Sequence, residues 1–541
     1  MKSLISTLMI FLIINIAQAK NIDGVAKYKW GYINTKGEMV IKPQFEEIDL
    51  YGFASNGMSA FKQGEKWGYI NTKGEIVIKP QFDEAYQFSS YGLAQIETNC
   101  HDSHDENENL LEHGQYCKSG YIDANGNIVI KPQFEKSRNF QSNGLAVFEK
   151  YYRVSEYGFN TSSGLIDSLG NVIVEPIFHN ISNFNTEQLC IVTQKTTMRN
   201  GIMDSKGKIL FWLPKNFSFA GSTDEIFDSN GLAKVQRSDG TGNYDTMCYV
   251  NKTGVLVGCK MQSIEFQDGN KIGKFQKNEK WGYIDASGKV IIKPKFDEVE
   301  HFDKYGMALV KHGNGWRYIN KTGDFAIKES FESAVDFYND ELAPVKKNNL
   351  WGYINRQGEM IIEPKFDDAN AFNLDSGLTR VIKNGKLGYI DKNGTMVIST
   401  KIESSDCCDN NHFLTKYIAS FEENNKIGIM DNKGRIIIPA ILSDAKVIMY
   451  KDIKLIIIRY SKDGKYAYLN EKGKMIIKPI YDYIANEGNP YLSPFSDEGI
   501  AMVRKNNLYG YIDINGDIIA KPQFKNASEF KNGFAAVLSK E

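Results

Sequence analysis

The sequence has few of the features that mark the commonest functional classes. Its 541 residues include seven His, 13 Pro and six Trp, and its 65 Lys and Arg nearly balance its 66 Asp and Glu. No basic stripe or surplus is visible along the chain. Because a nucleic-acid binder needs such a surplus, we do not expect nucleic acid as a partner.

Motifs for catalysis and cofactor binding are also missing. The chain has no nucleophile elbow with partners, no phosphate-binding loop and no dinucleotide fingerprint. The segments DANGN and DINGD lack the distant Glu of a calcium loop and are typical of turns. We therefore predict no catalytic residues, no metal site and no cofactor.

Carboxylates do recur in pairs after the P-x-F motif, as at Glu46-Glu47, Asp83-Glu84 and Asp297-Glu298. A glycosidase needs one pair of opposed carboxylates at a defined separation. A pair that returns in many copies of a repeat fits a polar rim better.

Only one long apolar run is present, from Leu4 to Ile16, after Lys2 and before Ala17-Gln18-Ala19. This order is typical of a secretory signal peptide, which we place at residues 1–19. A retained membrane anchor would need roughly twenty apolar residues, whereas this run has thirteen and contains Asn15. We expect export to the periplasm or the extracellular space, with no membrane span after cleavage.

Cysteine is scarce, but four of the seven are placed for pairing in an exported chain. Cys100 and Cys117 bracket an insertion, and Cys248 and Cys259 lie on the two arms of one predicted hairpin. We predict these as two disulfides. Cys190, in the apolar run LCIV, is expected in the core.

The insertion between Cys100 and Cys117 also contains His101, His104 and His113. With the two cysteines these could ligate zinc, but their order matches no zinc pattern that we can name. A loop closed by a disulfide, with an acidic tip, is the favoured interpretation.

The chain is built from one repeated segment. KWGYINTKGEMVIKPQF at residues 29–45 returns as KWGYINTKGEIVIKPQF at residues 66–82, and only Met39 and Ile76 differ. Less exact copies follow, about thirteen in all, at a mean period of about forty residues. Fixed periods of 20–50 residues indicate solenoids, propellers or arrays.

Each copy predicts a small antiparallel sheet. GLAQI-like, WGYIN and IVIKPQF segments read as three strands, joined by a polar turn and by a loop with Gly at its fourth position. A link F-x-x-A-x-x-F follows and forms either a fourth short strand or a packed turn. Pro cannot donate to a sheet, so we expect these prolines at strand ends or edges: Pro43, Pro80, Pro132, Pro294, Pro364, Pro479 and Pro522.

The predicted fold is all-β, a tandem array of about thirteen three- to four-stranded β-meander repeats. Stacking gives propeller-like rings or an open spiral, or alternatively a linear β-solenoid. The late strand Phe534–Leu538 could complete the first unit and close a ring. Because propellers usually have four to eight blades, we expect two rings or a spiral, with halves at 20–258 and 278–541 and a boundary at 259–277.

The units resemble the bacterial WG-repeat family, named for the pair seen at Trp30-Gly31, Trp67-Gly68, Trp281-Gly282 and Trp351-Gly352. Other copies depart from it, with Leu387, Ile427, Tyr509 or Ser119 in place of Trp. The resemblance implies a β-repeat scaffold and no catalytic residues.

Equivalent tryptophans could line up as a weak ligand platform: Trp30, Trp67, Trp281, Trp316 and Trp351. Core packing is favoured, because Leu and Ile replace Trp in several copies. We expect an exported, non-enzymatic scaffold that binds a protein or surface polysaccharide of the cell envelope. The alternative is a hydrolase with a site in a central channel, formed by degenerate copies near Gly164–Cys248 and Cys407–His412.

Overall fold

The protein was studied as a computed structural model. The structure describes residues 28–104, 110–153, 159–221, 223, 225–238, 244–337, 340–403, 414–462, 464–484 and 494–540. The expected signal peptide lies outside these residues. Within them the regular structure is β-strand, without helix. Accordingly, this part of the chain has no helix with the length and apolar character that crossing a membrane requires.

The strands form small antiparallel sheets, one per repeat, which we call blades. Blade 1 contains β47 (Asn526–Ala527), β48 (Phe534–Lys540), β1 (Tyr28–Asn34) and β2 (Met39–Phe45), and blade 2 contains β3 (Glu47–Ile48), β4 (Met58–Gln63), β5 (Lys66–Asn71) and β6 (Ile76–Phe82). Blade 3 contains β7 (Glu84–Ala85), β8 (Ala94–His104), β9 (Leu110–Ile122) and β10 (Ile128–Phe134), and blade 4 contains β11 (Lys136–Ser137), β12 (Leu145–Arg153), β13 (Phe159–Asp167) and β14 (Val172–Ile181). Blade 5 contains β15 (Leu189–Gln194), β16 (Asn200–Asp204) and β17 (Ile209–Trp212).

Blade 6 contains β18 (Phe217–Phe219), β19 (Leu232–Ser238), β20 (Tyr244–Asn251) and β21 (Leu256–Val257), and blade 7 contains β22 (Ser263–Glu265), β23 (Ile272–Lys277), β24 (Lys280–Asp285) and β25 (Val290–Phe296). Blade 8 contains β26 (Glu298–Val299), β27 (Met307–His312) and β28 (Gly315–Asn320), and blade 9 contains β29 (Ser333–Ala334), β30 (Leu342–Lys347), β31 (Leu350–Asn355) and β32 (Met360–Phe366). Blade 10 contains β33 (Asp368–Ala369), β34 (Thr379–Lys383), β35 (Lys386–Ile390) and β36 (Met396–Glu403), and blade 11 contains β37 (Ile418–Glu423), β38 (Lys426–Asp431) and β39 (Ile436–Tyr450). Blade 12 contains β40 (Ile453–Tyr460), β41 (Tyr466–Asn470) and β42 (Met475–Ile477), and blade 13 contains β43 (Tyr483–Ile484), β44 (Ile500–Lys505), β45 (Leu508–Asp513) and β46 (Ile518–Phe524).

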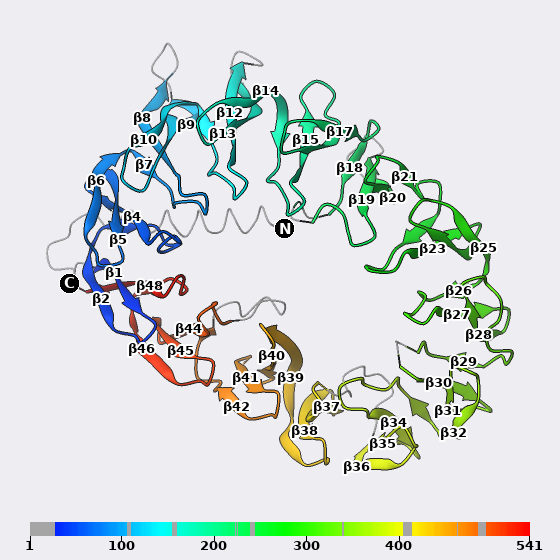
Figure 1. The fold of residues 1–541 in the computed structure, drawn as a ribbon. Helices are drawn as coiled ribbons and strands as arrows, with labels where there is room; N and C mark the ends of the chain where they lie inside the picture. Colours follow the sequence, from blue (N-terminus) through cyan, green and yellow to red (C-terminus); the bar gives the residue numbers. More distant parts are fainter. Residues whose placement is uncertain are drawn as a thin grey trace.

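A regular blade has four strands, in the order β3-β4-β5-β6 for blade 2. The predicted first, second and third strands are all present, and the F-x-x-A-x-x-F link supplies a short strand such as β7. That short strand pairs with β8 and is therefore part of blade 3, although it comes from the link after the third strand of blade 2. It lies toward the inside of the ring, and the third strand lies on the outside (Figure 1).

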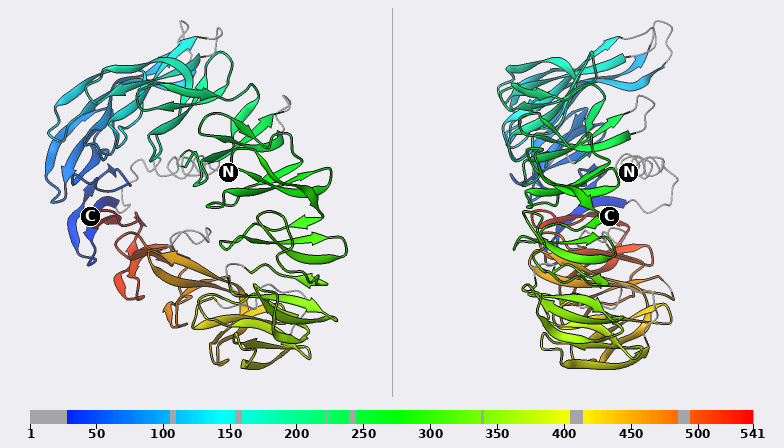
Figure 2. Two further views of the ribbon diagram at one scale, coloured as in Figure 1. Left: turned by 45° about the vertical axis from the view of Figure 1, so that its right-hand side comes forward. Right: turned by 90° about the vertical axis from the view of Figure 1, so that its right-hand side faces the viewer.

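The blades form one closed ring (Figures 1 and 2). β48 pairs along its whole length with β1, from Tyr28↔Lys540 to Asn34↔Phe534, so the two ends of the chain share blade 1. Thirteen blades are present in the described part of the chain, because two of the sheets, with seven and six strands, each contain two. The ring form of the prediction is confirmed, while the linear array, the open spiral and the second ring are not what the structure has.

The segment 259–277, expected as a boundary between two halves, contains the whole of β22 and β23. Its Phe266 and Phe275 share one apolar cluster with Tyr249 of blade 6 and Ile284 of blade 7. Packing is therefore continuous through this segment, and the division into two domains stays a prediction.

The core lies between neighbouring blades. One cluster joins Tyr69 and Ile78 of blade 2 to Ala94 and Ile122 of blade 3. At the closure, Ile33 of blade 1 packs with Tyr511 of blade 13 in the same manner. Each blade thus covers the apolar face of the next, which explains why a chain of this architecture repeats its sequence.

The Trp-Gly pair and the Lys-Pro pair of a repeat belong to one backbone feature. Opposite Gly68 the third strand bulges, since Trp67 pairs with Phe82 but Tyr69 pairs with Ile78. A Cβ on Gly68 would lie 2.5 Å from the Ile78 carbonyl oxygen and 2.7 Å from the Pro80 nitrogen. Only glycine allows this approach. The predicted edge position holds for Pro80, because β6 is an edge strand.

The glycine of the second loop makes the contact between blades. Gly74 has φ +80°, and a Cβ there would lie 3.0 Å from the Ile41 side chain of the preceding blade. At the closure, Gly37 also contacts the third strand of the preceding blade, where the nearest atom is the backbone carbonyl oxygen of Ile519 in β46.

Candidate functional site

The repeated carboxylates hold turns in place. Glu332 accepts hydrogen bonds from the backbone N–H groups of Asn348 and Asn349, at 2.8 and 3.1 Å. Asp367 accepts one from the Gly385 N–H at 3.0 Å. In each case the acid before a short inner strand caps the turn between the first and second strands of its own blade.

Asp297 combines this cap with an ion pair. It accepts a hydrogen bond from the Gly313 N–H at 2.9 Å and contacts Lys280 of the second strand. The Lys280 hydrogen bond, followed by that from Gly313, lowers the pKa of Asp297 although slight burial opposes the shift. This carboxylate is held ionised by its structural partners.

The second acid of each pair contacts the first strand instead. Ion pairs join Lys311 to Glu298 at 2.7 Å and Arg380 to Asp368 at 2.7 Å. The two acids therefore point to different partners and do not face each other as a glycosidase pair would. These contacts are those of a polar rim.

The five tryptophans of the weak ligand platform contact the blade cores. Trp30 is buried in the cluster of blades 1 and 2. The other four are half-buried and pack on the clusters beside them: Trp67, Trp281, Trp316 and Trp351. Lysines cover three of these rings, with Nζ 5.6 to 5.9 Å from the ring centre. Little aromatic face is left for a ligand.

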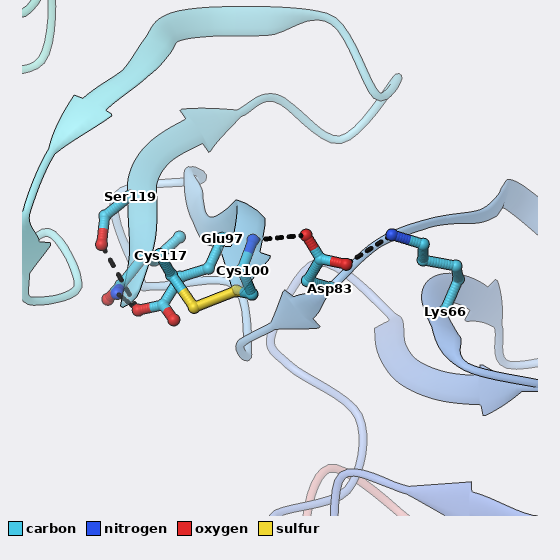
Figure 3. Close-up of a disulfide and its surroundings, with 7 residues drawn as sticks. Lys66, Asp83, Glu97, Cys100, Cys117 and Ser119 are labelled. Atoms are coloured by element: carbon cyan, nitrogen blue, oxygen red, sulfur yellow. Dashed lines mark hydrogen bonds and ion pairs between the residues drawn. A yellow bond between two sulfur atoms is a disulfide. The ribbon is translucent and has the colours of Figure 1, made fainter. Parts of the chain in front are cut away.

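Both predicted cysteine pairs are disulfides in the structure, Cys100–Cys117 and Cys248–Cys259. The first joins β8 to β9 beside Glu97, and Asp83 accepts a hydrogen bond from the Cys100 N–H while contacting Lys66 (Figure 3). Cys190 is a buried free thiol whose pKa burial raises to about 12. It is a core residue.

A metal at the insertion would have to use groups that the disulfide changes. Glu97, Cys100 and Cys117 have ligand atoms within 4.8 Å of one another. The two sulfurs are bonded to each other, so neither can act as a thiolate ligand. The side chains of His101, His104 and His113 lie outside the described residues.

The hydrolase alternative requires histidines close to carboxylates. In the described part of the chain one such pair lies within 4.0 Å, His301 Nε2 and Glu265 Oε1, at 3.5 Å between blades 7 and 8. Burial, followed by the charge of Lys274, lowers the pKa of His301. The segment Cys407–His412 lies outside the described residues.

A second charged group braces blades 8 to 10. Arg356 contacts Asp303 at 2.5 Å and lies between the rings of Tyr305 and Phe337, while Lys392 contacts buried Asp340 at 2.8 Å. Near it, burial raises the pKa of Asp336 to about 6, with Asp303 and Glu300 adding to the shift and a hydrogen bond from the Phe337 N–H opposing it. These ion pairs connect neighbouring blades, and the charges within each pair neutralise each other.

The outer wall of the ring carries the most regular exposed feature, which sequence reasoning missed. The first two residues of the third strand are both exposed, although they point to opposite faces of the sheet; Ile76 is 49% and Val77 44% exposed. The signal in the sequence was the apolar pair before the buried Ile of IVIKPQF. Seven blades have such a pair: Met39 and Val40, Ile76 and Val77, Ile128 and Val129, Val172 and Ile173, Val290 and Ile291, Met396 and Val397, Ile436 and Ile437.

The same strands resist pairing with a further strand. An exposed Lys follows the buried aliphatic residue here and in the corresponding segments of blades 12 and 13. None of these has an ion pair in the described part of the chain: Lys42, Lys79, Lys131, Lys293, Lys478 and Lys521. Proline and the bulge come next, as at Pro80. Lysine, proline and bulges on an edge strand oppose edge-to-edge pairing. A partner on this wall therefore meets side chains and not a free sheet edge.

Comparison with known families identifies the repeat. A model described as the WG containing repeat matches residues 30–67, 67–99, 120–152, 164–195, 281–316, 316–351, 351–386, 427–466, 466–509 and 509–540. The chain belongs to the WG-repeat family. The matched WG repeats begin at the second strand of a blade, where the Trp-Gly pair lies. A comparison with curated protein sequences gives no match.

Solved structures resemble this WG-repeat chain only distantly. The crystal structure of a eukaryotic initiation factor matches with 13% identity and a TM-score of 0.29, over 72% of this chain and 97% of that one. Apo AztD from Citrobacter koseri matches with 11% identity and a TM-score of 0.28, over 55% and 92%. Kluyveromyces lactis Hsv2p matches with 9% identity and a TM-score of 0.27, over 54% and 92%. Such scores carry no information on function.

Proposed function

We propose that this chain is an exported, non-enzymatic scaffold that binds a partner protein along the outer wall of its ring. The observation that carries the proposal is the repeated exposed aliphatic pair of the third strands. Apolar side chains that return at the same place in neighbouring blades give an extended surface, as repeat arrays commonly do.

Two further features support parts of the proposal. The exposed pairs are aliphatic while the Trp rings pack on the cores, which favours a protein over a polysaccharide, because flat sugar faces are best met by exposed aromatic rings. The disulfides Cys100–Cys117 and Cys248–Cys259 fit an oxidising compartment and hence export.

The proposal is tested by photo-crosslinking in the producing cells. A photoreactive residue replaces Val77 on the outer wall or, as the matched control, Tyr51, which is 72% exposed and belongs to no third strand. We expect one protein adduct at Val77 and none at Tyr51. The adduct protein is then purified, and its Kd is measured for a variant with serine at the wall pairs of blades 2, 3 and 7.

We expect that sixfold serine variant to bind at least tenfold more weakly, since each half-exposed aliphatic side chain contributes about 1 kcal/mol when buried. An adduct of equal yield at both positions would contradict the outer wall as the binding surface. Hydrolysis of peptide or glycan substrates by the purified chain, abolished by His301→Ala, would contradict the non-enzymatic part and favour the hydrolase.

A further inference from the structure

Blades 11 and 12 differ from the rest of the ring in charge. Residues 424–480 contain twelve Lys and Arg against five Asp and Glu, whereas the whole chain contains 65 and 66. This stretch covers β38 to β42, the yellow and orange sector of Figure 1. A nearly neutral protein thus has one strongly basic sector.

Part of the surplus lies in the loops between the second and third strands. In blade 1 this loop has Lys36 followed by Glu38, so its charges cancel. In blade 11 the same places are Lys433 and Arg435, and in blade 12 they are Lys472 and Lys474. All four are exposed, and an ion pair is found for Arg435 alone among them, with Asp431 at 2.6 Å.

The two loops border one continuous surface. A Cβ on Gly473 would lie 2.7 Å from the Ile437 Cδ1 atom, so the loop of blade 12 rests against the outer strand of blade 11. Ile436 is 60% and Ile437 38% exposed beside it. We call the surface the basic sector, and it consists of Lys433, Arg435, Ile436, Ile437, Lys472 and Lys474.

We propose that the basic sector, which includes the wall pair of blade 11, binds the surface of an anionic lipid membrane. Clusters of lysines draw a protein to anionic lipids at about 1 kcal/mol per Lys, and adjacent aliphatic side chains add apolar contact. Protein interfaces are instead poor in Lys and rich in aromatic residues, of which the basic sector has none. Exposed ammonium groups on long side chains suit a fluid layer of headgroups better than one fixed ligand.

The test is co-sedimentation of the full chain with vesicles of phosphatidylcholine alone or mixed with phosphatidylglycerol. We expect binding to the mixed vesicles only, weakened by added salt. Changing Lys433, Lys472 and Lys474 to Glu should reduce the affinity by at least about 100-fold. The control changes Lys36, Lys73 and Lys79 to Glu, which are exposed lysines of blades 1 and 2 and alter the net charge equally.

The contribution of the aliphatic side chains is tested by Ile436→Ser, which should weaken vesicle binding severalfold. Ile76→Ser, at the same place in blade 2, is the control. Absence of binding to mixed vesicles, or equal loss in both triple variants, would overturn the proposal. A chain that ignores vesicles but binds poly-L-glutamate through the same three lysines would also overturn it, in favour of an acidic protein.

Discussion

The third strand of blade 2 ends at Phe82, whereas the third strand of blade 11 continues as one strand from Ile436 to Tyr450. In blade 2 the chain bends and then forms the short inner strand of the next sheet. In blade 11 the outer strand itself becomes the inner strand of blade 12, and β14 joins blades 4 and 5 in the same way. The ring therefore has separate blades in one region and fused blades in two others.

A polar side chain distinguishes blade 2 from the fused blades. In blade 2 the Tyr69 hydroxyl donates a hydrogen bond to the Tyr86 carbonyl oxygen at 2.7 Å, just beyond the short strand. The equivalent residues of the fused blades are Leu165 and Ile429, which have no hydroxyl group. In both fused blades the backbone after the third strand finds its hydrogen bonds by continuing as a strand. Blade 5 also lacks the hydroxyl, with Ile202 at this place, but its third strand ends at Trp212.

The acid after the third strand contributes less to the bend. Asp83 stands there in blade 2, and the fused blades have His179 and Ser443 in its place. Blade 13 has Lys525, yet it bends, and its Tyr511 hydroxyl donates to the Ser528 carbonyl oxygen at 2.7 Å. The tyrosine thus correlates with the separate blades better than the acid does.

The largest loss of stability is expected at the glycine of the Trp-Gly pair, where the bulged third strand approaches most closely. Gly68→Ala places a methyl group against the backbone of Ile78 and Pro80, and we expect it to destabilise the protein by about 3 kcal/mol. In fused blade 11 the three atoms nearest to a Cβ on the equivalent Gly428 belong to the ring of Phe421, and a side chain shifts more readily than backbone, so Gly428→Ala should cost less. Thermal and urea unfolding measure both.

Gly221→Ala is the control, because no atom lies within 4 Å of the position of its Cβ. We expect it to leave the unfolding midpoint unchanged. A Gly68→Ala variant as stable as Gly221→Ala would show that the bulge can relax away from the glycine, and the proposed link between Trp-Gly and Lys-Pro would fail.

The second-largest loss of stability is expected on removal of the tyrosine hydroxyl that follows the Trp-Gly pair. Tyr283→Phe removes the donor to the Glu300 carbonyl oxygen, now 2.7 Å away, and leaves a buried acceptor unsatisfied. We expect a loss of about 1.5 kcal/mol in the free energy of unfolding, and faster hydrogen exchange in β26. Tyr51→Phe, at an exposed tyrosine, should change neither. Unaltered exchange in β26 would remove the hydroxyl as the cause of separate blades.

Much of this architecture could be predicted from the repeat. Strand identity, proline at the edges and packing between blades follow from a pattern that returns in nearly every copy. The fused strands could not, because a single Tyr to Ile change at position 429 leaves the apolar pattern intact. The closure of thirteen blades into one ring depends on the angle between blades, which contacts such as Gly74 with Ile41 set in three dimensions. The exposure of the wall pairs could not be predicted either, since an apolar residue in a strand does not show whether another blade covers it.

A third, smaller effect tests the acid as a cap. Glu332→Gln should cost about 1 kcal/mol, because a neutral amide accepts the Asn348 and Asn349 N–H groups less strongly than a carboxylate. Glu329→Gln is the matched control: its ion pair with Lys347 is solvent-exposed and contributes little. Equal unfolding midpoints for the two variants would mean that the caps are dispensable.

The smallest effect is a dependence on pH. The Lys280 and Gly313 hydrogen bonds hold the folded pKa of Asp297 below the unfolded value of about 3.9. Its stabilisation is therefore present above pH 4 and is lost as the pH falls through the lower folded value. Asp297→Asn should then be less stable than the parent at pH 7, by a few tenths of a kcal/mol because the group is partly exposed, and the gap should close near pH 3. In fused blade 11, Ser443→Ala should differ from the parent in stability by an amount that does not change with pH. If this difference also disappears near pH 3, carboxylates other than the caps cause the acid sensitivity.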